Sequence, residues 1–134
     1  MRRFEGFMKG VNLGGWISQF DVYSEEHFST FIQEEDIKRI KSMGFDHVRV
    51  PVDYNVLETE EGEIIESGYQ HLVDCLNWCK KYDLRMLIDV HEVYGYSFDP
   101  LKDMDREVFF YDKAMQARFF KLWENIATRF GGEH

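Results

Sequence analysis

Four polar residues lie where the alternation of side chains along a strand would bring them to one face of a sheet. They are Asn12, Arg49, Asp89 and His91, and each belongs to a short apolar run of the kind that forms buried strands. Burying a charged group costs free energy unless a ligand or an opposite charge uses it. We therefore interpret Arg49, His91 and Asn12 as candidate ligand-binding groups. Asp89 is better placed to hold Arg49 or His91 in position.

The phase of the strands supports this interpretation. In the second run, valines alternate with Arg49 and Pro51. Because successive side chains of a strand point to opposite faces, the valines should lie under helices while Arg49 faces the other way. The third run repeats the pattern, with Asp89 and His91 opposed to its apolar residues. The alternating valines are Val48, Val50 and Val52.

Aromatic residues follow each of the three runs closely. A flat ring beside a polar cleft suits the apolar C–H face of a sugar ring. We expect most of these rings to cover the mouth of the sheet, and we interpret Trp16 and Tyr94 as candidate platforms. The remaining rings are Phe20, Tyr54, Tyr96 and Phe98.

Periodicity predicts a strand followed by a helix three times in succession. The strands are expected over residues 8–14, 46–52 and 85–91, and the helices over 34–43, 67–82 and 113–130. Crossovers of this length join parallel strands, so the fold class is α/β with helices packed on a parallel sheet. In closed barrels of this kind the carboxyl ends of the strands build the active site, and Asn12, Arg49 and His91 lie toward those ends. Three such units are too few to complete an eight-stranded barrel, and residues 1–134 show no internal domain boundary.

The composition is that of a globular chain with an excess of acidic residues. The 134 residues include 25 Asp and Glu against 16 Lys and Arg, a formal net charge of -9. Phosphate binding depends on clustered Lys and Arg, so we expect no nucleic-acid partner. No apolar run approaches the roughly 18 residues of a membrane helix, so we expect no membrane association. No secretory signal is visible, which makes a cytoplasmic location the default expectation, or secretion if a signal has been removed.

Several catalytic motifs are incomplete. The run from His91 to Gly95 begins like the zinc motif HExxH, but its fifth residue is glycine and it ends a strand instead of lying on a helix. The glycines of residues 10–15 match neither a dinucleotide nor a phosphate loop, which disfavours a phosphate-binding barrel. Cys75 and Cys79 are spaced as buried positions of a helix. We expect reduced thiols, no metal site and no organic cofactor.

With these residues assembled, the chain resembles the amino-terminal part of glycoside hydrolase family 5, and in particular its clostridial-type β-glucanases and cellulases. The likeness runs in order through residues 10–16, 40–54, 87–91 and 120–130. In that family the arginine of the second strand and the histidine that ends the third bind and orient the sugar beside the scissile bond. The resemblance carries these roles to Arg49 and His91.

Two departures from the family pattern bear on function. Family members often have a second histidine and a small-Pro-Gly turn after the third strand, where this chain has Glu92-Val93-Tyr94-Gly95, so substrate contacts on that side are expected to differ. The family's acid/base glutamate follows the fourth strand and its nucleophilic glutamate ends the seventh, so the resemblance places both beyond residue 134. We expect no catalytic residue in this chain, because retaining hydrolysis needs two carboxylates about 5 Å apart and Glu92 cannot supply both.

The resemblance implies that residues 1–134 are the first three βα units of a TIM (β/α)8 barrel, a partial barrel. It also implies the amino-terminal part of a retaining enzyme that hydrolyses β-1,4 or mixed-linkage glucan, with the isolated chain inactive. The competing interpretation is a non-catalytic partial barrel that binds glycan or assembles with a partner chain. A three-stranded parallel sheet has two open edges, so we expect the isolated chain to form a homo-oligomer or a swapped assembly.

Overall fold

The computed structural model describes residues 5–132 and confirms the predicted α/β fold. The sheet has the order β1-β2-β3, with β1 at Gly10–Asn12, β2 at His47–Asp53 and β3 at Arg85–Glu92. Both strand pairs are parallel, as in the first units of a TIM barrel. Residues 1–4, which carry the basic start of the chain, and residues 133–134 lie outside the described part.

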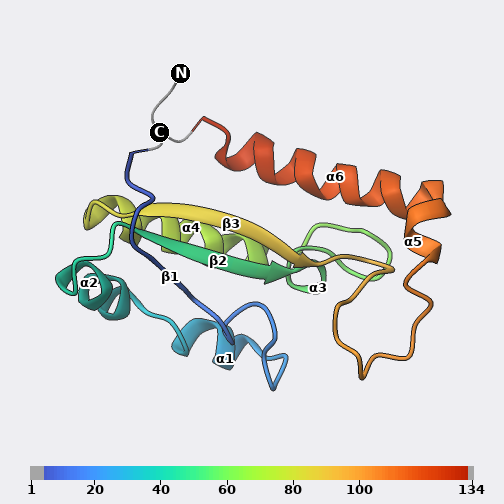
Figure 1. Ribbon diagram of the computed structural model, residues 1–134, viewed down its shortest axis with the longest axis horizontal. Helices are drawn as coiled ribbons and strands as arrows, with labels where there is room; N and C mark the ends of the chain where they lie inside the picture. The colour runs from blue at the N-terminus through green and yellow to red at the C-terminus, as the bar shows by residue number, and fades with distance from the viewer. Residues whose placement is uncertain (1–4, 133–134) are drawn as a thin grey trace.

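Three longer helices connect and follow the strands. They are α2 at Glu34–Ser42, α4 at Glu66–Lys81 and α6 at Lys113–Phe130, each within one residue of its predicted bounds. Figure 1 shows α4 behind the sheet and α6 running along the β3 side. The helices thus cover one face of β2 and β3 and leave the opposite face available to a ligand.

None of the helices within residues 5–132 combines the length and apolar character needed to cross a membrane.

Three short helices have no counterpart in the sequence prediction. They are α1 at Glu25–Thr30, α3 at Tyr54–Leu57 and α5 at Val108–Tyr111. Elements of four to six residues are shorter than the window in which helical periodicity can be recognised. The only local sequence signal for α1 is its N-cap residue. The Ser24 hydroxyl accepts a hydrogen bond from the His27 N–H at 3.1 Å at the start of this helix.

β1 begins at Gly10, later than predicted, and a side chain binds the backbone of the residues that precede it. The Asp46 carboxylate accepts the N–H groups of Met8 at 2.9 Å and Lys9 at 3.0 Å. Together with the hydrogen bond from His47, which is the largest cause, these bonds lower the pKa of Asp46 to about 2. The segment before β1 is thus tied to the start of β2 by an ionised side chain.

β2 is the central strand although it contains Pro51, which has no N–H to donate. Alternate residues of a parallel strand direct their backbone groups to the same neighbour. The Arg49 carbonyl accepts the Leu13 N–H at 2.9 Å, and the Asp53 N–H donates to the Ile17 carbonyl at 3.0 Å. Pro51 lies between these two bonds, where the chain has already left β1, so its missing donor is not needed.

The core lies between the helix-covered face of the sheet and α4, with α6 contributing from the side. The prediction that the β2 valines lie under helices is confirmed, because Val48, Val50 and Val52 are all fully buried. Burial of this apolar surface is the main stabilising contribution to the layer. The helical residues of the core include Tyr69, Leu72, Cys75, Cys79, Leu122 and Ile126, and both cysteines are free thiols.

Trp16 lies in the core and not at the mouth of the sheet. Its side chain is 0% exposed, and its Nε1–H donates to the Phe28 carbonyl at 2.6 Å. Gly15 adopts a left-handed turn with φ of 74°, and the following ring packs edge-on against His71. A ring without a free face cannot stack on a ligand, so the prediction that Trp16 is a sugar platform is wrong.

The closest helix contact suggests a stability test at Gly68. A Cβ at this position would lie 1.8 Å from the Val56 carbonyl oxygen of α3. We expect Gly68→Ala to lower the free energy of unfolding by about 3 kcal/mol, as overpacking does, in urea denaturation. Gly14→Ala is the control because its Cβ would meet nothing within 4 Å. Equal stability of the two variants would contradict this packing.

A second test separates the two roles considered for Trp16. Removing a fully buried indole leaves a cavity and an unpaired Phe28 carbonyl, so Trp16→Ala should cost about 3–5 kcal/mol of stability. Thermal unfolding followed by circular dichroism measures this loss. A variant that keeps the wild-type melting temperature would show that the ring is not a core residue.

Candidate functional site

The sheet brings Asn12, Arg49, Asp89 and His91 into one hydrogen-bonded group, which we call the inner-face cluster. Arg49 Nη2 donates to Asp89 Oδ2 at 2.5 Å, and Arg49 Nη1 donates to Asn12 Oδ1 at 3.2 Å. His91 Nδ1 lies 3.1 Å from the same Asp89 oxygen. Strand alternation therefore places these residues together, and Asp89 holds both Arg49 and His91.

The strand register sets the geometry of this cluster. Arg49 is paired with Asn12 on one side and with Leu87 on the other, while Asp89 is paired with Pro51. The guanidinium must therefore reach diagonally along the sheet toward the carboxyl end to meet Asp89. Pro51 carries no polar group that could compete for that carboxylate. The register thus aims the charged end of Arg49 at the end of the sheet where ligands bind in barrels.

The Asp89 carboxylate also selects the tautomer of His91. An ionised carboxylate can only accept, so the 3.1 Å contact requires a proton on His91 Nδ1. The 3.4 Å approach of Arg49 Nη2 to the same nitrogen is longer and joins two donors. In the neutral ring, Nε2 is then free to accept a hydrogen bond from a ligand hydroxyl.

The charged side chains of the cluster are partly open to solvent. The exposed fractions are 34% for Arg49, 31% for Asp89 and 24% for His91. One cation and one carboxylate nearly cancel, so the cluster offers fixed donors and an imidazole acceptor without a large net charge. This combination suits a neutral ligand with many hydroxyl groups better than an ion.

Tyr94 belongs to a stack that fastens α6. The Arg118 guanidinium lies 3.9 Å from the centre of the Tyr94 ring, and Arg118 Nε donates to the buried Glu58 carboxylate at 2.6 Å. The Tyr54 ring contacts Tyr94 edge-on, and burial, helped by a hydrogen bond to Glu60, raises the pKa of Tyr54 to about 12. One face of Tyr94 is thus occupied, and its predicted role as a platform concerns the other face alone.

A hollow of about 460 Å³ lies at the carboxyl ends of β2 and β3, beside the inner-face cluster. We call it the carboxyl-end hollow. Its wall includes Glu92, the residue that follows His91 and ends β3. Sequence reasoning did not find it, although the departure from the family pattern at Glu92 is a signal that points to it. The lining residues are Gln19, Phe20, Asp53, Asn55, Glu92, Phe98, Asp99, Pro100 and Lys102.

The two most buried carboxylates of this hollow have different environments. Glu92, 8% exposed, accepts the Ser97 hydroxyl at 2.5 Å and forms an ion pair with Lys102. Asp53, 6% exposed, accepts the Gln19 N–H at 3.1 Å, and burial raises its pKa. The two residues are register partners at the ends of β2 and β3, and the charge of Glu92 adds to the rise in the pKa of Asp53. Asp53 Oδ1 is buried and has no hydrogen-bond partner among the described residues. Within residues 5–132, no three His, Cys, Asp or Glu side chains are grouped to hold a metal ion.

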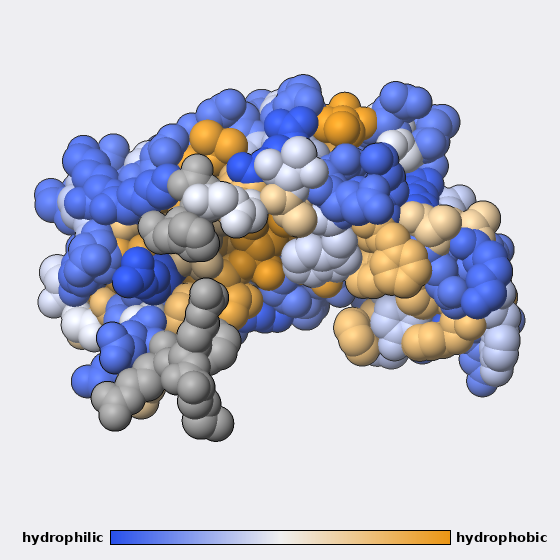
Figure 2. Space-filling view, turned by 90° about the horizontal axis from the view of Figure 1, so that it is seen from above, coloured by the Kyte–Doolittle hydropathy of each residue, from blue (hydrophilic) through white to orange (hydrophobic). Residues whose placement is uncertain are grey.

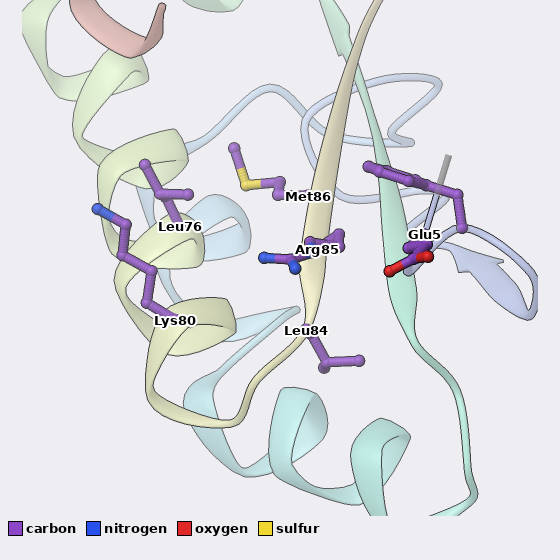
Figure 3. Close-up of a pocket in the computed structure, with 7 residues that line it drawn as sticks. Glu5, Leu76, Lys80, Leu84, Arg85 and Met86 are labelled. Carbon is purple, nitrogen blue, oxygen red and sulfur yellow. The ribbon is translucent and has the colours of Figure 1, made fainter. Parts of the chain in front are cut away.

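A second hollow, of about 360 Å³, lies at the opposite end of β3. Figure 3 shows Arg85 and Met86 at the start of β3, Leu84 just before it, and Leu76 and Lys80 on α4. The inner-face cluster lies at the far end of the same strand, so this hollow takes no part in it. The candidate ligand-binding groups therefore lie away from this second hollow, toward the carboxyl ends of the strands.

Known proteins resemble this chain over almost all of its length. The sequence profile of Cellulase (glycosyl hydrolase family 5) matches residues 8–134. Cellodextrinase A of Ruminococcus flavefaciens is 46% identical over 98% of this chain, and endoglucanase C of Acetivibrio thermocellus is 46% identical over 95%. The chain covers 38% and 37% of the lengths of these two relatives.

Solved structures share the fold at lower identity. Cel5A of Thermotoga maritima, crystallised with cellobiose, matches 96% of this chain and 40% of its own with a TM-score of 0.69 at 22% identity. The rutinosidase of Aspergillus niger matches 90% of this chain and 43% of its own, with a TM-score of 0.73 at 21% identity. The profile match over nearly the whole sequence, together with these relatives and this sheet, shows that the chain belongs to glycosyl hydrolase family 5.

Proposed function

We propose that this chain is the amino-terminal part of a retaining β-glucanase that hydrolyses β-1,4 or mixed-linkage glucan, and that the inner-face cluster binds the sugar. The observation that carries the proposal is the bonding of Arg49 and His91 to one Asp89 oxygen at the carboxyl end of the sheet. The names of the relatives, a cellodextrinase and an endoglucanase, support the substrate class.

In this proposal the chain binds and orients the sugar. Arg49, held by Asp89, donates hydrogen bonds to ring hydroxyls from a fixed position, so little side-chain freedom is lost when the sugar binds. His91 accepts a hydrogen bond from a sugar hydroxyl through Nε2, while its Nδ1–H donates to Asp89. Asn12, bonded to the other arm of Arg49, adds an amide at the β1 side.

The proposal places the bond-breaking carboxylates outside these 134 residues. Retaining hydrolysis needs a nucleophile and an acid/base carboxyl about 5 Å apart. At the carboxyl ends of the described strands, Asp89 is paired with Arg49 and Glu92 with Lys102. Asp53 is 6% exposed and accepts the Gln19 N–H through Oδ2. We therefore expect the isolated chain to hydrolyse no glucan, and the proposal requires neither a metal ion nor an organic cofactor.

The binding role is tested by removing the two ligand groups separately. In the protein that contains this chain, Arg49→Ala and His91→Ala should each lower kcat/KM on barley glucan about a hundredfold, as expected when a hydrogen bond to a charged or oriented group is lost. Arg85→Ala is the matched control because Arg85 lies at the amino end of β3. Wild-type kinetics in a folded Arg49→Ala variant would refute the binding role.

A second candidate function is a glycan-binding module that assembles with a partner. The observation that favours it is the open sheet: within residues 5–132, β1 and β3 each pair with β2 alone among the named strands. Leu87 on the inner face is 41% exposed, although it lies on a strand of a parallel sheet. Such a surface is stabilised when another polypeptide covers it.

Size-exclusion chromatography with light scattering tests this open sheet. Unpaired backbone groups at a strand edge favour pairing with another chain, so the isolated 134-residue chain should elute as a dimer or larger species at micromolar concentration. A single sharp peak with the mass of a monomer would contradict the expectation. Hydrolysis of glucan by the isolated chain, abolished by Glu92→Gln, would contradict the assignment of the catalytic carboxylates.

A further inference from the structure

We propose that Phe98 is a platform on which a second sugar ring of the glucan stacks, in the carboxyl-end hollow, and that Glu92 is the positioning residue that holds it there. The inference rests on the proposed function, since it extends the sugar-binding surface from the inner-face cluster into the adjoining hollow. It assigns to this chain a role in deciding how long a stretch of glucan is bound.

Phe98 joins the hollow to the inner-face cluster. Its side chain lines the hollow, and its ring centre lies 6.3 Å from that of His91. A ligand hydrogen-bonded to His91 at one ring would therefore place its next ring beside Phe98. The C–H face of a pyranose is apolar and packs against an aromatic face.

Phe98 is exposed although its backbone is firmly held. The side chain is 66% exposed, yet the Ser97 hydroxyl before it donates to Glu92 at 2.5 Å and accepts the Asp99 N–H at 3.1 Å. Arg106 Nε donates to the Ser97 carbonyl at 2.8 Å. An aromatic side chain whose loop is already ordered loses little entropy when it binds.

Glu92 is the anchor of this loop. It ends β3 and is 8% exposed, and it binds Ser97 through one oxygen and Lys102 through the other. Both partners lie on the loop that carries Phe98. The residue that departs from the family pattern is therefore used to fix the wall of the hollow, and its negative charge is neutralised by Lys102.

The other walls of the hollow suit a neutral polyol. Gln19 and Asn55 carry amide groups, which can donate and accept hydrogen bonds, and Asp53, whose pKa is raised by burial, lines the same hollow. A platform with polar groups around it is the arrangement expected of a pocket that orients a ligand through a few hydrogen bonds.

Exposure alone does not single out Phe98. Figure 2 shows apolar side chains gathered at the right-hand end, toward which β2 and β3 point in Figure 1. Phe110 and Phe120 are 61% and 62% exposed, but neither lines the carboxyl-end hollow. Phe98 differs from them in its position beside His91, and this difference provides a matched control.

The test uses the 134-residue chain and cellotetraose as the probe. Saturation-transfer NMR should show transfer to the sugar C–H protons, and titration should give an about tenfold weaker Kd for Phe98→Ala, the effect of losing one stacked ring face. Phe98→Tyr should stay within about twofold of wild type, and so should Phe120→Ala. Circular dichroism checks that each variant is folded.

The positioning role of Glu92 has its own readout. Glu92→Gln should weaken binding in the wild-type background and have no further effect in the Phe98→Ala background, because it acts through that ring. Additive losses would overturn the positioning role. If Arg49→Ala weakens binding while Phe98→Ala does not, the platform is refuted and the proposed function stands. If the wild-type chain binds no cellotetraose, both are contradicted.

Discussion

The alternation of side chains along β2 determines both what holds the sheet together and what the sheet presents to a ligand. Val48, Val50 and Val52 are fully buried against the helices, and Arg49, between two of them, faces the other side. A slip of one residue would place the guanidinium in the apolar layer, at a cost that no neighbouring carboxylate would offset. The packing of the valines therefore fixes the position of Arg49, and Asp89 then fixes the direction in which it points.

Two successive residues at the end of β3, His91 and Glu92, have different roles: the first is a candidate ligand-binding group and the second holds the following loop. His91 turns to the inner face, where its Nδ1–H donates a hydrogen bond to Asp89. Glu92 turns to the following loop, where Ser97 and Lys102 bind it. The same alternation that separates Arg49 from the valines thus separates a ligand group from a structural anchor. The residues that match the family pattern, Arg49 and His91, lie on the inner face, whereas Glu92, which departs from that pattern, binds the following loop.

The long elements could be predicted because their signals are local. α6 has the bounds that periodicity predicts, and Asp112 caps it by accepting the N–H groups of Ala114 and Met115. The burial of Trp16 could not be predicted. Its hydrogen-bond acceptor, the Phe28 carbonyl, belongs to α1, a short helix that the sequence does not reveal. The position of Phe98 likewise depends on the ion pair between Glu92 and Lys102, ten residues apart, which no periodic pattern encodes.

The central claim is that the inner-face cluster binds a glucan ring. The most direct test is a crystal structure of the protein that contains this chain, soaked with cellotetraose. The account predicts sugar hydroxyls within hydrogen-bond distance of Arg49 and of His91 Nε2, with the His91 Nδ1–H still hydrogen-bonded to Asp89. Oligosaccharide bound instead in the hollow at the amino end of β3, with the inner-face cluster free of sugar, would contradict it.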